Sequence, residues 1–317
     1  MNASTATGTI ATARATTSSY TGRFAPSPTG PLHLGSLLTA AGSYLQARAA
    51  GGAWLLRIED LDTPRVVPGA ADDILRTLER FGFEWDGEIA RQSERTALYE
   101  TALAKLDAAG ACFLCSCSRK ELASRHALFA AEEDSFYPGT CRDGAARPDR
   151  PLAVRFRAVD SAIEFNDELQ GRLVQNVAHS LGDFIIRRRD GLFAYQLAVV
   201  VDDAEQQVTE VVRGSDLLSN TPRQILLQQG LRLPRPGYMH LPLLTEADGR
   251  KLSKSQRAVA ASTAQPAATL HRVLSWLRQE PPLELARGST RELWSWAVRA
   301  WNPTPLRDVR EIRLEAI

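Results

Sequence analysis

The feature that most constrains the fold is the order of elements near the N-terminus. Residues 20–24 have the composition of a short strand, which runs into residues 25–31, where three prolines and a glycine exclude regular structure. Small and apolar residues then recur at helical spacing over 34–49, and 54–58 is a short buried strand. Strand, helix and strand in this order predict a βαβ unit. We therefore expect an α/β fold with a parallel sheet and helices on its faces.

The rest of the chain continues this alternation. We expect helices over 68–81, 94–109, 197–204 and 222–229, strands over 151–170 and 208–212, and a hairpin over 184–195 that turns at Asp190-Gly191. After Gly249 the pattern is mostly helical, and we expect its four tryptophans to pack in a helical core rather than to stack on bases: Trp276, Trp294, Trp296 and Trp301.

Charge and hydropathy limit the partners. The chain has 38 Lys and Arg against 37 Asp and Glu, a net charge of +1, which excludes a surface coated in basic residues but allows a basic groove. The run 187–189 is the densest basic cluster and by itself is typical of a solvated face. No stretch approaches the roughly 20 apolar residues of a membrane helix, so we expect no membrane partner. The first 20 residues are mostly Ala, Thr and Ser, which predicts a disordered extension.

Four cysteines are clustered rather than scattered, at positions 112, 115, 117 and 141. Clustering argues against a disulfide framework and for a metal site in a reducing, cytoplasmic compartment. The thiolates of Cys115, Cys117 and Cys141 suit tetrahedral zinc, whereas Cys112 has the character of a small buried apolar residue. Chemistry alone would nominate His126 as the fourth ligand, because imidazole is a far commoner ligand than phenolate.

Two segments carry residues suited to nucleotide chemistry. In residues 23–36 the strand ends, the chain turns and a helix opens, and in open α/β sheets ligands bind at such carboxyl ends. Helix N-terminal N–H groups favour phosphate, Gly35 allows close approach, and His33 can donate a hydrogen bond. Further along, Lys251 and Lys254 in Lys-Leu-Ser-Lys-Ser can neutralise charge on a triphosphate. Each segment alone is a weak signal.

Together the two segments resemble the paired signatures of class I aminoacyl-tRNA synthetases. The sequence Arg-Phe-Ala-Pro-Ser-Pro-Thr-Gly over 23–30 is similar to the corresponding motif of the glutamyl and glutaminyl branch. Ser36 stands where the general His-x-Gly-His motif has its second histidine, so the contribution of that position departs from the family pattern.

The resemblance implies roles for individual residues. Arg23 would pair with a glutamate carboxylate, Glu59 would hold the substrate ammonium, and Tyr195 and Arg213 would complete a cationic pocket that rejects glutamine. For the last two the alternatives are a core tyrosine and a solvated arginine. The implied glutamate site is Arg23, Phe24, Ala25, Pro26, Ser27, Glu59, Tyr195 and Arg213. The implied ATP site is His33, Gly35, Ser36, Lys251 and Lys254, with His33 and Lys254 as catalytic residues and Mg²⁺ bound with the ATP.

The resemblance also bears on the metal and on the acceptor. It points to Tyr137, in Tyr-Pro-Gly-Thr-Cys, as the fourth ligand of a structural zinc beside Cys115, Cys117 and Cys141. Only 62 residues follow Ser255, which, with the cysteine pattern, is similar to glutamyl-queuosine tRNA(Asp) synthetases rather than to complete glutamyl-tRNA synthetases.

From this resemblance we expect ATP-dependent activation of L-glutamate and transfer of the glutamyl group to queuosine in tRNA(Asp). The alternatives are a short glutamyl-tRNA synthetase that charges the 3′ end and a non-catalytic zinc-bearing RNA-binding protein. The expected organisation has five parts: an extension (1–20), the first half of a Rossmann-like catalytic domain (21–110), a zinc-bearing insertion (111–180), the second half of the catalytic domain with the Lys-Leu-Ser-Lys-Ser loop (181–256) and a helical C-terminal region (257–317).

Overall fold

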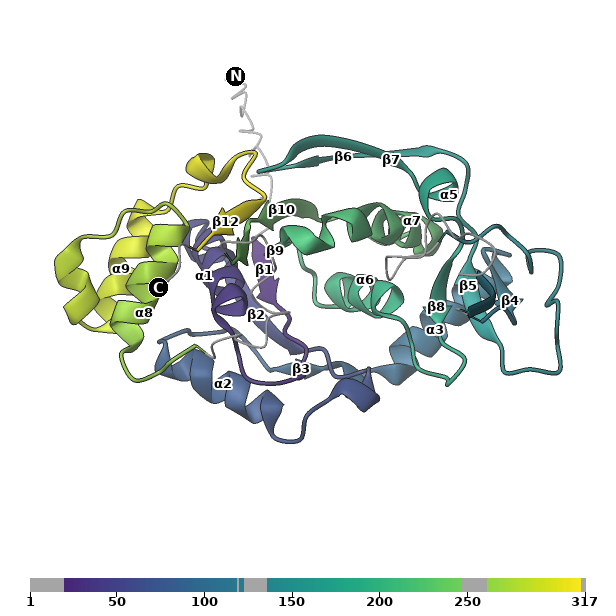
Figure 1. The fold of residues 1–317 in the computed structure, drawn as a ribbon, viewed down its shortest axis with the longest axis horizontal. Helices are drawn as coiled ribbons and strands as arrows, with labels where there is room; N and C mark the ends of the chain where they lie inside the picture. The colour runs from purple at the N-terminus through teal and green to yellow at the C-terminus, as the bar shows by residue number, and fades with distance from the viewer. Residues whose placement is uncertain (1–19, 119, 123–135, 247–260, 315–317) are drawn as a thin grey trace, which may run out of the picture.

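A computed structural model describes residues 20–118, 120–122, 136–246 and 261–314 and has the α/β architecture expected from the sequence (Figure 1). Three strands form a parallel sheet in the order β1 (Thr21–Phe24), β2 (Ala53–Ile58) and β3 (Ala90–Arg91). A second sheet has the order β7 (Gly171–Asn176), β6 (Ala162–Asp167), β10 (Gly237–Leu241) and β9 (Glu210–Gly214). Its β6, β10 and β9 are parallel, and β7 returns antiparallel to β6.

The two sheets meet where β1 lies beside β9 (Figure 1). The N–H of Thr209 donates to the carbonyl of Thr21 at 2.9 Å, and the N–H of Thr21 donates to the Thr209 hydroxyl at the same distance. The carboxyl ends of β1, β2, β9 and β10 therefore face one edge of the molecule, which is where ligands bind in an open parallel sheet.

Helices cover both faces of the strands and bury two apolar clusters. One cluster joins the strands to α1 (Leu34–Ala49), α2 (Ala70–Arg80), α8 (Pro266–Trp276) and α9 (Thr290–Ala300). The other joins them to α3 (Thr96–Ala108), α6 (Tyr195–Glu205) and α7 (Thr221–Leu231). Successive residues of β9 enter different clusters, Val212 the first and Val211 the second, because successive side chains of a strand point to opposite faces.

A small antiparallel sheet carries the cysteines. Its order is β4 (Cys112–Cys115), β5 (Ala153–Phe156) and β8 (Phe184–Arg187), and the helical turn α5 (Val177–Ser180) lies before β8. It encloses a third, small cluster that includes Cys115, Tyr137 and Cys141. Because β8 pairs with β5, the small sheet extends past residue 180, the boundary predicted from the sequence. The five-part division remains a proposal.

The helix predicted over 34–49 is confirmed at both ends, and the other four helices are confirmed within three residues of their predicted ends. The predicted hairpin over 184–195 is confirmed only in part. Its turn forms, but the second arm pairs through a single bridge between Arg187 and Phe193, and α6 begins at Tyr195. The return arm is short because the apolar run that follows is needed as a helix face against the second cluster.

The C-terminal region is helical as predicted, with one exception. A short strand, β12 (Glu311–Arg313), pairs in parallel with β11 (Leu243–Thr245) and returns the chain to the segment that follows β10. Trp294 is buried and Trp276, Trp296 and Trp301 pack against the first cluster, which confirms their core role. Among the residues described, no helix combines the length and the apolar character that a membrane crossing requires.

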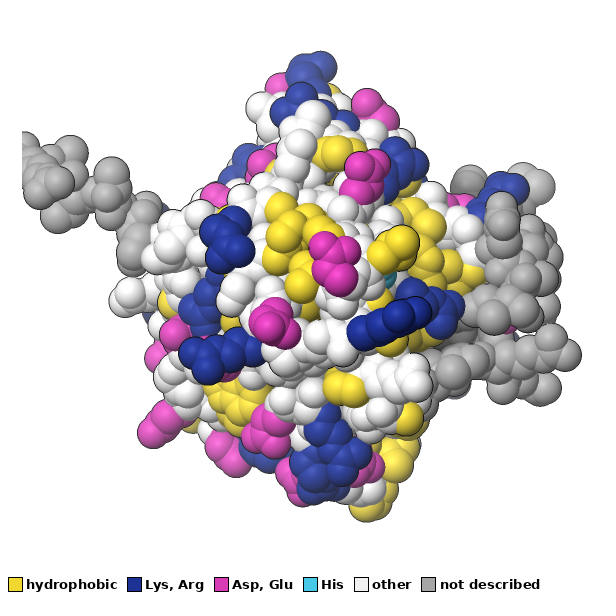
Figure 2. Space-filling model, turned by 90° about the vertical axis from the view of Figure 1, so that its left-hand side faces the viewer, with side chains coloured by type: hydrophobic (Ala, Val, Ile, Leu, Met, Phe, Trp, Pro, Cys, Tyr) yellow, Lys and Arg dark blue, Asp and Glu magenta, His cyan; other side chains and the backbone are white. Residues whose placement is uncertain are grey.

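Figure 2 shows the face that carries the C-terminal helices. Basic and acidic side chains are interleaved around apolar patches there, so neither sign of charge dominates this face. This agrees with the near-zero net charge of the chain.

Candidate active site and metal centre

Two buried arginines point from the strands toward α6. Arg23 of β1 lies in register with Leu55 of β2, so it shares a face with Arg57, two residues further along that strand. Asp203 of α6 receives both guanidiniums. Arg23 donates from Nε and Nη2 to its two oxygens at 3.1 and 3.3 Å, and Arg57 Nη2 donates to Oδ1 at 2.7 Å. With exposures of 3% and 0%, both cations are buried, and both are paired with the same carboxylate.

A second acidic group, Glu59, follows the end of β2. Its side chain is 8% exposed and lies 3.5 Å from Arg57 Nη2. Burial raises the pKa of Glu59 to about 7, although the guanidiniums of Arg57 and Arg23 oppose that rise. The Glu59 N–H donates to the carbonyl of Pro26 at 3.0 Å, so this carboxyl group and the proline turn meet at the carboxyl edge of the sheet.

Arg213, near the end of β9, is equally buried but has a different environment. It is 4% exposed, and it donates from Nε to His240 Nε2 at 2.9 Å, from Nη1 to Gln224 Oε1 at 2.8 Å and from Nη2 to Thr221 Oγ1 at 2.8 Å. A longer bond of 3.4 Å reaches the carbonyl of Leu217. Every one of these acceptors is uncharged, and within the described part of the chain no carboxylate lies at ion-pair distance from Arg213.

Tyr195 connects these groups. It is the first residue of α6 and is partly buried against the second apolar cluster. Burial raises the pKa of its phenol, and the guanidiniums of Arg213 and Arg23 and the carboxylates of Glu59 and Asp203 all act on it. The four predicted residues Arg23, Glu59, Tyr195 and Arg213 are therefore brought into one electrostatic site.

The predicted turn residues fall into two groups. The ring of Phe24 stacks on Trp54 with centroids 6.2 Å apart and lies in the core, so only its backbone can face a substrate. Ala25, Pro26 and Ser27 follow in the loop after β1, where Ser27 is exposed and the other two are partly buried.

His33 caps the first helix. Its Nδ1 accepts from the N–H of Ser36 at 3.1 Å, and its Nε2 lies 3.0 Å from the Ser36 hydroxyl. A Cβ on Gly35 would lie 3.2 Å from the His33 ring, so glycine gives this ring its room. The serine at the atypical position of the motif therefore fixes the histidine by two hydrogen bonds.

The two predicted lysines, Lys251 and Lys254, lie outside the described residues. The chain is described up to Glu246, just after β11, and again from Ala261, whose N–H donates to the carbonyl of Leu32 at 2.8 Å. The described end at Ala261 is thus held beside His33.

The sequence did not single out five buried polar or charged residues near the site: Arg57, Asp167, Asp202, Asp203 and His240. Two acids directly after the valines of the predicted helix 197–204 were the one available signal, because an acidic pair at the end of an apolar helix face requires partners. Asp202 is fully buried and accepts from Tyr99, Gln92 and Arg95.

The sulfur atoms of Cys115, Cys117 and Cys141 all lie within 4.8 Å of one another. The Cys117 and Cys141 sulfurs are 3.6 Å apart, and the Tyr137 hydroxyl is 3.5 Å from the Cys115 sulfur. In a tetrahedron with Zn–S bonds of about 2.3 Å and a Zn–O bond of about 2.1 Å, the S···S and S···O edges are about 3.8 and 3.6 Å. The Cys117–Cys141 and Cys115–Tyr137 separations therefore match edges of a tetrahedral zinc site, and the three sulfurs are close enough together to hold a metal ion.

The surrounding residues hold this donor set in place. The backbone of Tyr137 packs against Gly182, where φ is +71° and a Cβ would lie 2.1 Å from the Tyr137 carbonyl oxygen, so only glycine fits. The buried Arg155 donates from Nε to the Cys115 sulfur at 3.3 Å and lies over the Tyr137 ring at 3.8 Å. A guanidinium there would offset the negative charge of cysteine thiolates bound to a metal. His126, the alternative ligand, lies outside the described residues.

Cys112 is 7% exposed and its sulfur lies 3.7 Å from Asp107 Oδ1, in the second apolar cluster. It is therefore a buried residue apart from the metal-binding group, as predicted.

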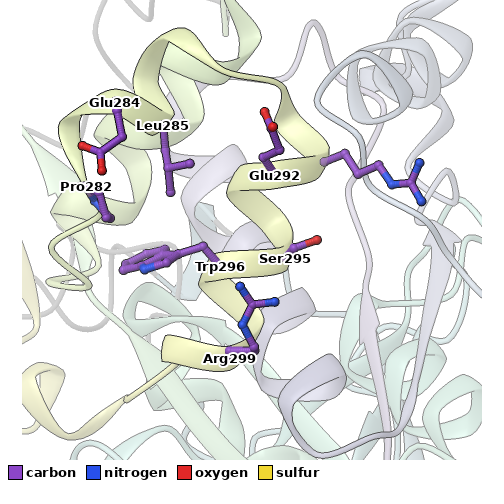
Figure 3. A pocket seen from close by; sticks show the side chains of 8 residues that line it. Pro282, Glu284, Leu285, Glu292, Ser295, Trp296 and Arg299 are labelled. Atoms are coloured by element: carbon purple, nitrogen blue, oxygen red, sulfur yellow. The ribbon is translucent and has the colours of Figure 1, made fainter.

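A separate cavity of about 470 Å³ lies in the C-terminal helices (Figure 3). Trp296 and Arg299 of α9 face it, together with Pro282 and Leu285. Among the described residues, none predicted for substrate, nucleotide or metal binding lines it.

Comparison with known proteins gives consistent matches. The family described as tRNA synthetases class I (E and Q), catalytic domain, matches residues 20–269. Two relatives named glutamyl-Q tRNA(Asp) synthetase align over 285 residues. The one from Chromobacterium violaceum is 55% identical over 89% of this chain and 94% of its own length. The one from Dechloromonas aromatica is 54% identical over 90% and 95%.

Among solved structures, a glutamate-tRNA synthetase from Elizabethkingia anophelis superposes with a TM-score of 0.75 at 28% identity. The match covers 94% of this chain and 68% of that one. A glutamate tRNA ligase from Elizabethkingia meningosepticum, determined in complex with its amino acid, gives a TM-score of 0.74 at 28% identity, with 94% and 67% covered.

Proposed function

The chain belongs to the class I tRNA synthetases of the E and Q type, and from this premise we propose that it activates L-glutamate with ATP and transfers the glutamyl group to queuosine in the anticodon of tRNA(Asp). Membership of this family makes the chain a ligase-type enzyme. Relatives at 54–55% identity that carry the name glutamyl-Q tRNA(Asp) synthetase support this acceptor.

The observation that carries the choice of glutamate is the uncompensated charge of Arg213. A buried guanidinium held only by neutral acceptors retains an unsatisfied positive charge, and the ligand that satisfies it is an anion. The side-chain carboxylate of glutamate is such an anion, whereas the amide of glutamine would leave the cation unpaired. Arg23 is already paired with Asp203, so in our proposal it borders the pocket and Arg213 reads the substrate side chain.

Glu59 is the proposed partner of the substrate ammonium. Its carboxyl group lies at the carboxyl edge of β2 beside the Pro26 turn, and its raised pKa reflects a buried acid whose charge a bound cation would stabilise. The charges of Glu59 and Arg213 both influence the pKa of Tyr195, and this residue would lie between the two ends of the amino acid.

The nucleotide would bind at the N-terminus of α1, whose N–H groups favour phosphate. In the proposed reaction the α-carboxylate of glutamate attacks the α-phosphorus of ATP and pyrophosphate leaves, with no protein nucleophile. His33 and Lys254 would stabilise the negative charge on the phosphorus oxygens, and Lys251, Gly35 and Ser36 would help to bind ATP. Mg²⁺ bound with ATP would supply further charge neutralisation.

We propose a structural role for zinc held by Cys115, Cys117, Cys141 and Tyr137. With all four positions of the tetrahedron filled by protein atoms, no position is open for water or substrate, which is typical of structural rather than catalytic zinc.

Glutamate-dependent ATP–pyrophosphate exchange, measured with and without total tRNA, tests the activation step. Exchange without tRNA is the expected result. Exchange only with tRNA would favour a short glutamyl-tRNA synthetase, and no exchange under either condition would favour a non-catalytic RNA-binding protein. Lys254→Ala is the control, because a catalyst should lose exchange with this change whereas a pure RNA binder should keep its affinity.

The acceptor requires its own experiment. Labelled glutamate should be transferred to tRNA(Asp) that contains queuosine and not to the same tRNA with guanosine at that position. Equal transfer to both tRNAs would show that the acceptor lies elsewhere, such as the 3′ end, while leaving the activation step intact.

A further inference from the structure

Behind Arg213 lies a buried pair that the substrate itself need not touch. His240 of β10 is 0% exposed, and its Nδ1 lies 2.5 Å from Oδ2 of Asp167, at the end of β6. The other oxygen of Asp167 accepts three backbone N–H groups: those of His240 at 3.2 Å, Leu169 at 3.1 Å and Gln170 at 2.9 Å. Asp167 is therefore fixed by the hairpin turn between β6 and β7 and by the adjacent strand.

This arrangement determines which nitrogen of His240 carries the proton. Arg213 Nε can only donate, so His240 Nε2 must accept, and the ring proton must be on Nδ1, where Asp167 receives it. Burial lowers the pKa of His240 to about 4, with Arg213 acting in the same direction and Asp167 against it, so the ring is neutral near pH 7.

The chemical consequence concerns charge. Had Asp167 reached Arg213 directly, the ion pair would have neutralised the guanidinium, as Asp203 neutralises Arg23. Because the neutral imidazole of His240 lies between Asp167 and Arg213, Arg213 is oriented by an acceptor that carries no net charge.

We propose that Asp167 and His240 are positioning residues for glutamate recognition, which hold Arg213 in a fixed orientation while leaving its positive charge available to the substrate carboxylate. This rests on the proposed function of the site. Asp167 fixes the tautomer of His240, His240 orients Arg213, and Arg213 contacts the substrate.

Asp167→Asn is the most informative change. The amide oxygen can keep the three backbone hydrogen bonds, but the amide nitrogen donates to Nδ1 and so moves the ring proton to Nε2, toward Arg213 Nε. Donor then faces donor, and Arg213 must turn away. We expect the KM for glutamate in pyrophosphate exchange to rise by about 10- to 100-fold, the effect typical of residues that orient a ligand-binding group. The KM for ATP should stay within about twofold, since the nucleotide site lies at α1.

His240→Gln keeps the relay without an imidazole. With Asp167 in place, the amide nitrogen of Gln donates to the carboxylate and its amide oxygen accepts from Arg213, so H240Q should keep a KM for glutamate close to that of the wild type. In D167N/H240Q two amide nitrogens face each other, so the KM should be as high as in D167N. Purely structural damage to the buried pair would instead raise the KM in H240Q as well. His271→Gln is the matched control, because His271 is also buried, at 8% exposed, but bonds to the carbonyl of Pro281 beside α8. It should leave both KM values unchanged.

Nitrogen-15 NMR of the histidine rings reads the tautomer without any enzymatic assay. The chain has only five histidines, and H240Q identifies the signal of interest. The expected result is a protonated Nδ1 in the wild type and a protonated Nε2 in D167N. A wild-type ring protonated at Nε2 would overturn the proposal, as would a D167N ring with the inverted tautomer and an unchanged KM for glutamate. If the wild type shows no glutamate-dependent exchange, the proposed function fails, and that result is distinct because the NMR experiment still tests the tautomer.

Discussion

Two parts of the sheet each bury arginine and differ in how the charge is compensated. At β1 and β2, Arg23 and Arg57 are paired with the carboxylate of Asp203. At β9 and β10, Arg213 is held by an imidazole, an amide and a hydroxyl. Burial is nearly the same in both places, so accessibility does not distinguish them. Charge compensation does, and it indicates that the first part supports the site whereas the second binds the anionic substrate.

The largest effect on stability is expected from removing the carboxylate that serves both arginines of the first part. Asp203→Asn leaves two buried guanidiniums without their shared anion, and breaking such a buried pair typically costs about 3–5 kcal/mol. Urea denaturation monitored by circular dichroism measures the loss. The control is Asp73→Asn, which breaks an exposed pair with Arg76 and should change stability by less than about 1 kcal/mol.

The same carboxylate predicts a pH dependence of stability. Burial alone would raise the pKa of Asp203, but Arg23 and Arg57 outweigh it and hold the pKa below its ordinary value. A depressed pKa in the folded state stabilises the fold above the ordinary pKa of an Asp carboxyl, and this contribution is lost as pH falls toward the folded value. D203N should therefore lose less stability on acidification than the wild type, and equal losses would contradict the assignment.

A second change gives Arg213 a carboxylate partner, as Arg23 already has. Gln224→Glu places a carboxylate where the amide oxygen now accepts from Arg213 Nη1 at 2.8 Å, so Arg213 stays in place but becomes neutralised. We expect the KM for glutamate to rise by about 100-fold, which corresponds to about 2.7 kcal/mol, with a smaller preference over glutamine. Pyrophosphate exchange with each amino acid measures both quantities.

Gln206→Glu is the matched control for that change. Gln206 accepts from Arg57 Nη1 at 2.6 Å, where Asp203 and Glu59 already compensate the charge. This variant should alter the KM for glutamate far less than Q224E. If the two variants behaved alike, the difference between the two parts of the sheet would have no functional meaning.

Glutamate affinity should also depend on pH through Glu59. A carboxyl group whose pKa is raised to about 7 by burial is mostly protonated below that pH and then cannot hold an ammonium ion. The value of kcat/KM for glutamate should therefore fall by about tenfold per unit of pH on the acid side of 7. Glu59→Gln should give a low kcat/KM that no longer varies over this range, and a preserved pH profile in that variant would assign the titration to another group.

The sequence predicted the parts of the site that lie in local patterns and missed those that join distant segments. The proline turn, the helix with His33 at its start and the three cysteines are each contained in a short stretch, and all are found as predicted. Asp203, the partner of Arg23, lies 180 residues away in the sequence. His240, the partner of Arg213, lies on another strand between two buried apolar residues. Residue types alone cannot show that one arginine is neutralised and the other is not.

The smallest effect on glutamate activation is expected from the metal centre. Cys117→Ser removes one donor from a site on the small antiparallel sheet, and the protein should lose most of its zinc, measured by atomic absorption against about one zinc per chain in the wild type. Because no residue of the glutamate pocket contacts this donor set, the KM for glutamate should stay within about threefold, whereas the melting temperature should fall. Cys112→Ser, a cysteine outside the donor set, should keep its zinc. A rise in the KM for glutamate as large as that of Q224E would show that the two regions are coupled, and the metal would then belong to the recognition of glutamate as well as to the fold.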